Sequence, residues 1–81
     1  MDTPALRELI LSELCRIAPE ITPDEVPNDE DLRDAVDLDS MDFLHLVAAV
    51  SKKSGVMIPE ADYPKIMTLQ RMLDYLQHQT E

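Results

Sequence analysis

The sequence predicts an all-α fold, a small bundle of three main helices plus one short helix, and three observations support this class. Residues with high helix propensity, among them Leu, Met, Ala, Glu and Gln, are plentiful. A single Gly, two Tyr and one Phe give little basis for a sheet with tight hairpins. Apolar residues recur at spacings of three and four. Because 81 residues support only one core, residues 1–81 are expected to form a single domain.

The first helix is predicted over residues 4–18. Thr3 is a suitable N-cap, and Pro4 suits a first helical position because proline has no N–H to satisfy there. Pro19 ends the segment. The apolar stripe consists of Leu6, Leu9, Ile10, Leu14 and Ile17.

Residues 19–39 form a long acidic loop between the first and second helices. Three prolines interrupt it, and Asp and Glu crowd it. A loop of this length in a compact domain is usually either functional or disordered. We favour an ordered, functional loop, because apolar residues recur in it as if to fasten it over a core: Ile21, Val26, Leu32, Val36 and Leu38.

The second helix is predicted over residues 40–54, with Asp39 as its N-cap and Gly55 just beyond its end. An extended connector follows, because the residue before Pro59 is disfavoured in helical geometry. A short helix is predicted at 61–66 and a last helix at 69–77.

The net charge of −10 is concentrated in the first forty residues. Nucleic acids and anionic membranes attract basic surfaces, so neither is expected as a partner, whereas basic proteins are. No apolar run approaches the roughly 20 residues of a membrane span. With one Cys and no signal-peptide pattern, we expect a free-standing cytoplasmic monomer.

Neither catalysis nor a dedicated metal site is expected. The two His stand apart from any nucleophile pattern, and Cys15 in an amphipathic helix is expected to be an inert, buried thiol. An EF-hand loop counted from Asp37 would place Met41, Asp42 and Ala48 at its fifth, sixth and twelfth positions, and all three are unsuitable. The chain alone is therefore not predicted to be an enzyme.

The second helix is unusually apolar, since only Asp42 and His45 are polar in MDFLHLVAAV at 41–50. One face suffices to pack a three-helix core, and we assign that face to Leu44, Val47 and Val50. The remaining apolar residues, Met41 and Ala48 among them, form either a partner surface or a strip that the long loop covers. Ser40, between Asp39 and Asp42, could simply be a residue that suits the first turn of a helix.

Several motifs together resemble the acyl carrier proteins. DLDSMD at 37–42 resembles their Asp-Ser-Leu motif, with Met41 in place of the usual Leu. Ile58-Pro59 falls where that family has Ile-Pro after the second helix. Ile66, Thr68 and LDYL at 73–76 resemble its short third and its fourth helices. The resemblance extends from Leu6 to Leu76.

This resemblance implies that Ser40, next to Asp39, carries 4′-phosphopantetheine, installed from coenzyme A by a Mg-dependent phosphopantetheinyl transferase. The terminal thiol would hold acyl intermediates as thioesters for enzymes such as a ketosynthase and an acyltransferase, in fatty-acid, polyketide or related secondary biosynthesis. Partners would dock on a surface made of Asp39, Met41, Asp42, His45 and Ala48. The acyl chain would lie in a cavity lined by Leu44, Val47, Ile58, Ile66 and Leu73.

Some residues depart from the family pattern. His45 takes a typical Glu position, Lys52 and Lys53 stand where acids are common, and Phe43 is bulkier than expected. These departures favour a specialised carrier. Two alternatives remain: an aminoacyl or peptidyl carrier, against which the acidity counts, and a non-covalent helical interaction module.

Overall fold

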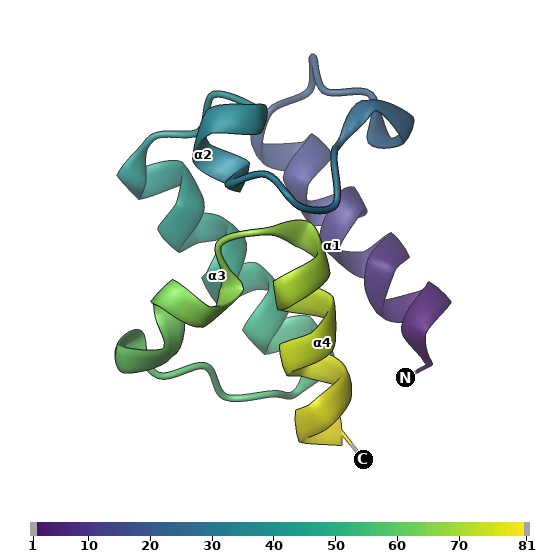
Figure 1. Ribbon diagram of the computed structural model, residues 1–81, viewed down its shortest axis with the longest axis vertical. Coiled ribbons are helices and arrows are strands. Elements are labelled where there is room, and N and C mark those ends of the chain that lie inside the picture. The colour runs from purple at the N-terminus through teal and green to yellow at the C-terminus, as the bar shows by residue number, and fades with distance from the viewer. Residues whose placement is uncertain (1, 81) are drawn as a thin grey trace.

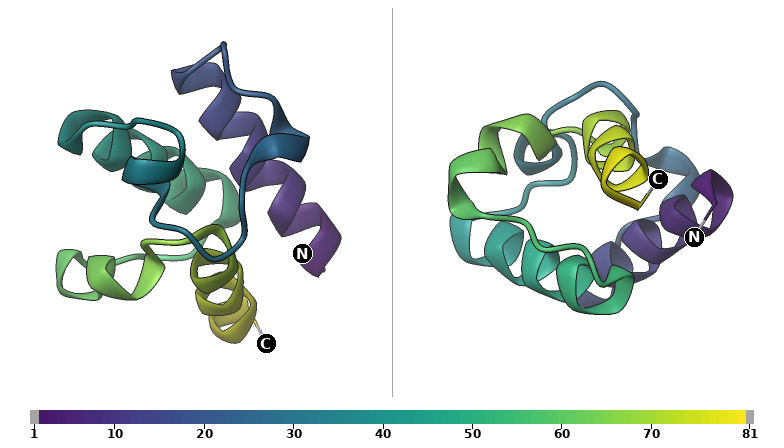
Figure 2. Two further views of the ribbon diagram at one scale, coloured as in Figure 1. Left: turned by 45° about the horizontal axis from the view of Figure 1, so that its top comes forward. Right: turned by 90° about the horizontal axis from the view of Figure 1, so that it is seen from below.

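The computed structural model describes residues 2–80, which fold as an all-α bundle and confirm the predicted class (Figure 1). Within that range the structure contains no strand, only one isolated bridge between Asp31 and Thr68. The two views of Figure 2 show α1, α3 and α4 arranged around a common interior, with the loop and α2 across one end. In chain order the elements are α1 (Thr3–Ile17), η1 (Pro23–Glu25), α2 (Leu32–Ala35), α3 (Ser40–Ser54), η2 (Glu60–Ile66) and α4 (Leu69–Thr80), where η marks a 3₁₀ helix.

The bounds of α3 coincide with the predicted range, whereas α1 both begins and ends one residue before its predicted bounds. Asp2 caps α1, because its carboxylate accepts a hydrogen bond from the Ala5 N–H at 3.0 Å. The prediction of Thr3 as N-cap is therefore wrong. The Thr3 hydroxyl instead donates to Gln77 Oε1 at 2.6 Å. η2 begins one residue before the predicted start, and α4 extends three residues beyond the predicted end.

The long acidic loop is ordered and holds two short helices that the sequence did not indicate. Asp31 caps α2 by accepting from the Arg33 N–H at 2.9 Å. The Leu32 N–H donates to the Met67 carbonyl at 2.8 Å, and the Gln70 N–H donates to the Asn28 carbonyl at 2.9 Å. Val26, Leu32 and Leu38 are buried, while Ile21 and Val36 pack against the core. These contacts confirm that apolar residues fasten the loop over the core.

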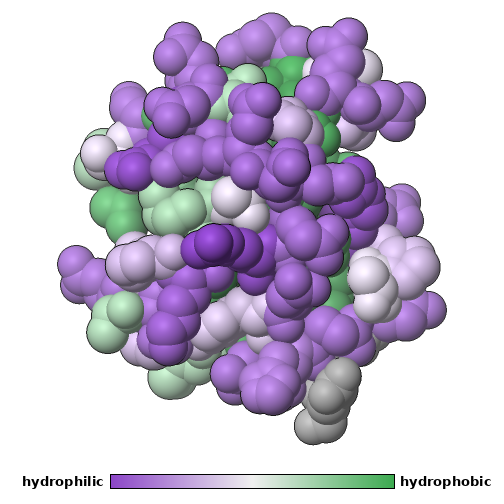
Figure 3. All heavy atoms as spheres, viewed as in Figure 1, coloured by the Kyte–Doolittle hydropathy of each residue, from purple (hydrophilic) through white to green (hydrophobic). Residues whose placement is uncertain are grey.

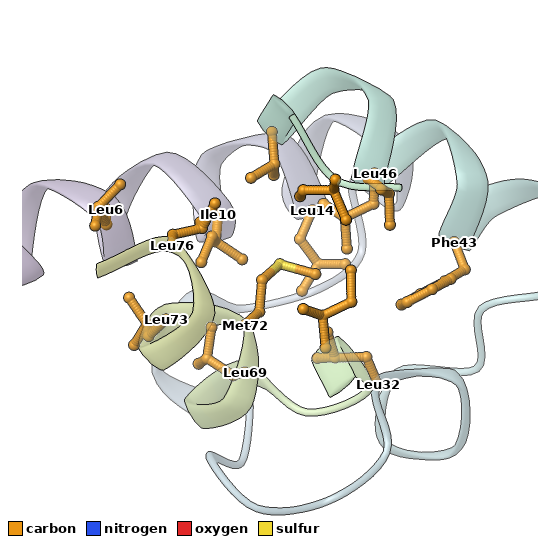
Figure 4. Close-up of a cluster of buried hydrophobic side chains, with 14 of the residues drawn as sticks. Leu6, Ile10, Leu14, Leu32, Phe43, Leu46, Leu69, Met72, Leu73 and Leu76 are labelled. Atoms are coloured by element: carbon orange, nitrogen blue, oxygen red, sulfur yellow. The ribbon is translucent and has the colours of Figure 1, made fainter. Parts of the chain in front are cut away.

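The core is one cluster of buried side chains between α1, α3 and α4 (Figure 4). Its α3 face consists of Phe43, Leu46, Val47 and Val50. The expectation that Leu44 belongs to this face is wrong, because 41% of Leu44 is exposed while Phe43 is only 5% exposed. Positions 43, 46, 47 and 50 have the spacing of one helical face, and Leu44 lies about 100° away from Phe43 around the helix.

Glu13 is the buried charged residue among those described, and it joins α1 to the last turn of α3. Its carboxylate forms an ion pair with Lys53 Nζ and accepts a hydrogen bond from Arg16 at 3.3 Å. Hydrogen bonding to Lys53 holds the pKa of Glu13 below its ordinary value, against the opposing effect of burial. Of the two lysines that depart from the family pattern, Lys53 is therefore engaged in an internal contact.

The C-terminal end of α3 is closed by local hydrogen bonds. Gly55 adopts φ 75°, a left-handed conformation that glycine reaches without the steric cost of a side chain. Its N–H donates to the Ser51 carbonyl at 3.0 Å, and the Ser51 hydroxyl donates to the Val56 carbonyl at 2.6 Å. These bonds direct the connector back along the bundle, where Val56 and Ile58 are buried.

Candidate functional site

Ser40 is the first residue of α3, and its position follows from the residues just before it. Asp37 adopts φ 56°, a left-handed conformation that Asp tolerates better than most residues. Leu38 is then buried, so it fixes the chain to the core immediately ahead of the helix. As predicted, Asp39 is the N-cap: its carboxylate accepts from the Asp42 N–H at 2.8 Å.

The Ser40 side chain is exposed, and no hydrogen bond within residues 2–80 engages its hydroxyl. The N–H groups of the first helical residues have no acceptor inside a helix. Asp39 satisfies those of Asp42 and Phe43, through its side chain and its carbonyl respectively. The N–H groups of Ser40 and Met41 remain directed out of the helix end. A hydroxyl beside two such donors at a positive dipole end suits attachment of a phosphate group.

The surface around Ser40 is acidic and not neutralised internally. Asp39 is exposed and Asp42 is half-buried, and neither takes part in a salt bridge within the described range. Arg33, on α2, pairs instead with Asp31 at 3.3 Å. That pair lowers the pKa of Asp31 through hydrogen bonding. The negative charge beside Ser40 is therefore available to a basic partner.

An exposed strip runs along the outer face of α3 and consists of Met41, Leu44, His45 and Ala48. Met41 is 59% exposed and Leu44 is 41% exposed. The alternative in which the long loop covers these residues is therefore wrong. Apolar side chains also reach the surface over the first turns of α3 in Figure 3, on a face that is otherwise largely hydrophilic. Leu44 belongs to this strip although the sequence placed it in the core.

The residues expected to line an acyl cavity separate into two groups. Val47, Ile58, Ile66 and Leu73 are all buried in one cluster, to which α3, the connector, η2 and α4 each contribute. Leu44 does not join them, for the reason of helix rotation given above.

An open hollow of about 340 Å³ borders that cluster at Phe43, and the sequence did not indicate it. Phe43 and Tyr63 meet there edge to face, with ring centroids 6.3 Å apart and an interplanar angle of 83°. The only sequence feature that could have pointed to this hollow is the aromatic residue Phe43, three residues after Ser40. The residues that line the hollow are Arg33, Phe43, Tyr63, Pro64 and Met67.

The comparisons with known proteins agree with this geometry. The family model described as "Phosphopantetheine attachment site" matches residues 5–76. An acyl carrier protein of Rhodococcus erythropolis is 31% identical over 74 residues, covering 88% of this chain and 81% of the relative. A meromycolate extension acyl carrier protein of Mycolicibacterium smegmatis is 30% identical over 76 residues, covering 90% and 77%. An acyl carrier protein of Campylobacter hominis is 25% identical over 73 residues, covering 90% and 86%.

Proposed function

The chain belongs to the phosphopantetheine-attachment family of acyl carrier proteins, and from that premise we propose that Ser40 is the residue that carries the group. The chain has an acyl carrier role, with covalent 4′-phosphopantetheine as its cofactor. The observation that supports Ser40 most directly is its exposed, unengaged hydroxyl at the first position of α3. When bound, the group supplies a thiol that holds an acyl chain as a thioester.

The residues around Ser40 suit the attachment step. The Ser40 oxygen forms a bond to the phosphorus that bears pantetheine in coenzyme A, the hydroxyl proton is lost, and adenosine 3′,5′-bisphosphate leaves. The product is a phosphodiester with one negative charge. The N–H groups of Ser40 and Met41 and the helix dipole favour that charge. The chain offers an oxygen and a binding environment, and the separate transferase activates the reaction.

The surface that partners recognise is proposed to combine charge with the exposed strip. Asp39 and Asp42 attract basic patches on the transferase, ketosynthase or acyltransferase, because complementary charge speeds encounter. Met41, His45 and Ala48 then make contact, and the exposure of Leu44 supports its inclusion in the same surface. No helix within residues 2–80 is both long and apolar enough to cross a membrane.

The pathway is proposed to be one that builds or extends acyl chains. Relatives named acyl carrier protein and meromycolate extension acyl carrier protein support this class. His45 and exposed Lys52, where acids are common in the family, favour a specialised set of partner enzymes. Family membership does not favour the aminoacyl carrier or the non-covalent module.

Incubation with coenzyme A and a broad-specificity phosphopantetheinyl transferase tests Ser40 by intact mass. The wild-type chain should gain the mass of one phosphopantetheine, and Ser40→Ala should gain none. Ser12→Ala is the matched control, because Ser12 is an exposed serine on α1. An unmodified wild type, or modification of Ser40→Ala, would contradict the proposal.

A further inference from the structure

Phe43 closes the end of the core that lies nearest to Ser40. It follows Ser40 by three residues, which places it about one turn further along α3. Its ring extends beneath α3 at one end of the labelled side chains in Figure 4, beyond Leu46 and near Leu32. Phe43 is only 5% exposed, so its ring fills the end of the core that lies one helical turn from Ser40.

Tyr63 holds Phe43 from the outside, and the rest of the fold holds Tyr63. The two rings pack edge to face, as noted above, which is a favoured aromatic geometry. Next to Tyr63 on η2, Asp62 accepts a hydrogen bond from the Tyr75 hydroxyl of α4 at 2.6 Å. Ile66, at the end of η2, is fully buried. Movement of Tyr63 away from Phe43 would therefore disturb η2 and its attachment to α4.

The side chains behind Phe43 are also tightly enclosed. Leu32, Leu46 and Val47 are each at most 2% exposed. Protein interiors are packed about as densely as organic crystals, so an added alkyl chain requires other side chains to move. The hollow lined by Phe43 and Tyr63, in contrast, is open to solvent.

We propose that the Phe43–Tyr63 pair excludes the carried acyl chain from the core, and that the chain lies instead in the open hollow. This inference rests on the proposed function of Ser40. Apolar carbons of the acyl chain would contact the two rings, Pro64 and Met67. Arg33 borders the hollow and can donate to an oxygen substituent on the chain while it remains paired with Asp31. The hollow therefore suits acyl chains with a polar substituent near an apolar segment.

Methyl NMR of loaded protein tests this placement without any partner enzyme. The transferase loads the chain from hexanoyl- or decanoyl-coenzyme A, and intact mass confirms complete loading. In the wild type, the methyl signal of Met67 should shift relative to the acetyl form, as should the ring-proton signals of Tyr63 recorded alongside, whereas the methyl signals of Val47 and Leu73 should not. The melting temperature should be the same for both chain lengths, because a chain in an open hollow buries little additional surface.

Phe43→Ala should reverse this pattern. With the ring removed, Val47 and Leu73 signals should shift on loading, and the melting temperature should rise from hexanoyl to decanoyl. Leu11→Ala is the control, since it shortens a partly buried apolar side chain on α1, away from both the hollow and the exposed strip, and should keep the wild-type pattern. If Phe43→Ala does not fold, Phe43→Leu replaces it, and the wild-type spectra remain decisive.

The outcomes separate the two proposals. Failure to load, seen by mass, counts against Ser40 and not against the aromatic pair. If the wild type loads and its Val47 and Leu73 signals do shift, with a melting temperature that rises with chain length, exclusion from the core is overturned. Loading that shifts neither set of signals would overturn placement in the hollow.

Discussion

The two ends of α3 use their polar residues in opposite ways. At the C-terminal end, Lys53 pairs with buried Glu13, and Ser51 and Gly55 close the helix through hydrogen bonds. At the N-terminal end, Asp39 caps the helix, but the Ser40 hydroxyl and the charge of Asp42 have no protein partner within residues 2–80. One end thus fixes the helix against α1, while the other leaves its chemistry available.

This contrast changes the interpretation of the two lysines. From the sequence, Lys52 and Lys53 formed one basic group that could select partners. The ion pair to Glu13 assigns Lys53 to the fold, whereas Lys52 is exposed and forms no ion pair within residues 2–80. The proposed specialisation of partner choice therefore rests on Lys52 and His45.

The largest effect on stability is expected for substitution of Phe43, the buried side chain near the N-terminal end of α3. Phe43→Ala should lower the free energy of unfolding by about 3–5 kcal/mol, since it removes a large buried side chain. Leu44→Ala should cost less than about 1 kcal/mol, because Leu44 is substantially exposed. Urea unfolding of both variants measures the difference. Equal costs would show that α3 is rotated differently about its axis.

Removal of the internal ion pair should have the next largest effect. Lys53→Met should lower the free energy of unfolding by about 1–3 kcal/mol, because it leaves the buried Glu13 carboxylate with weaker compensation. Lys52→Met is the matched control and should change stability by no more than about 0.5 kcal/mol. Phosphopantetheine loading of both variants should match the wild type. Slower loading of Lys53→Met with unchanged stability would break the contrast between the two ends.

The pH dependence of unfolding examines the same pair. The folded-state pKa of Glu13 lies below its ordinary value of 4.5, so the unfolded chain binds its proton at higher pH than the folded chain does. The stabilisation is present above the unfolded-state pKa and is lost as pH falls through the folded-state pKa. As pH falls from about 5 to about 3, across the ordinary pKa values of carboxylates, Glu13→Gln should lose less stability than the wild type. Urea unfolding at each pH measures this loss. An identical acid response would indicate that Glu13 is not stabilised by Lys53.

Charge reversal at the N-terminal end should alter kinetics more than stability. Asp42→Lys should slow association with the transferase and weaken its dependence on salt, because complementary charge acts mainly on the association rate. Its stability should change by only about 0.3–1 kcal/mol through the helix dipole. Stopped-flow binding at several NaCl concentrations measures the rate. Unchanged association would exclude Asp42 from the recognition surface.

The smallest effect is expected for Lys52→Glu. If exposed Lys52 repels the basic patch of a fatty-acid ketosynthase, the reversal should improve turnover with that enzyme and impair turnover with the native partner. Arg71→Glu on α4 is a control for net charge, since Arg71 is exposed, forms no ion pair within residues 2–80 and lies on another helix. Equal kinetics for Lys52→Glu and the wild type with both enzymes would remove the specialisation argument and leave the acyl carrier role intact.

The sequence predicted those features that local chemistry determines. Asp39 and Gly55 flank a long apolar segment, so the bounds of α3 followed directly. The N-cap of α1 was predicted one residue too late, because Asp2 and Thr3 are both suitable N-caps close to Pro4. The four residues of α2 are too few for a periodic pattern, and the long acidic loop gave no other helical signal.

Features that depend on contacts between elements could not be derived in the same way. Eight of the ten residues in 41–50 are apolar, so the pattern did not distinguish a core face with Phe43 from one with Leu44. Glu13 and Lys53 are forty residues apart in the sequence and lie on different helices. Neither residue is unusual in its local sequence, so their pairing could not be predicted. Ser40 could be proposed from the sequence because its motif and its place at a helix start are both local.

Localisation of the attached group tests the central claim most directly. Trypsin cleaves after Arg33 and Lys52, so the peptide 34–52 contains Ser40 and Ser51 and excludes the other two serines. After transferase treatment of the wild type, fragmentation of this peptide should place the phosphopantetheine on Ser40. Attachment at Ser51, whose hydroxyl serves the closed end of α3, or on any other peptide, would contradict the account.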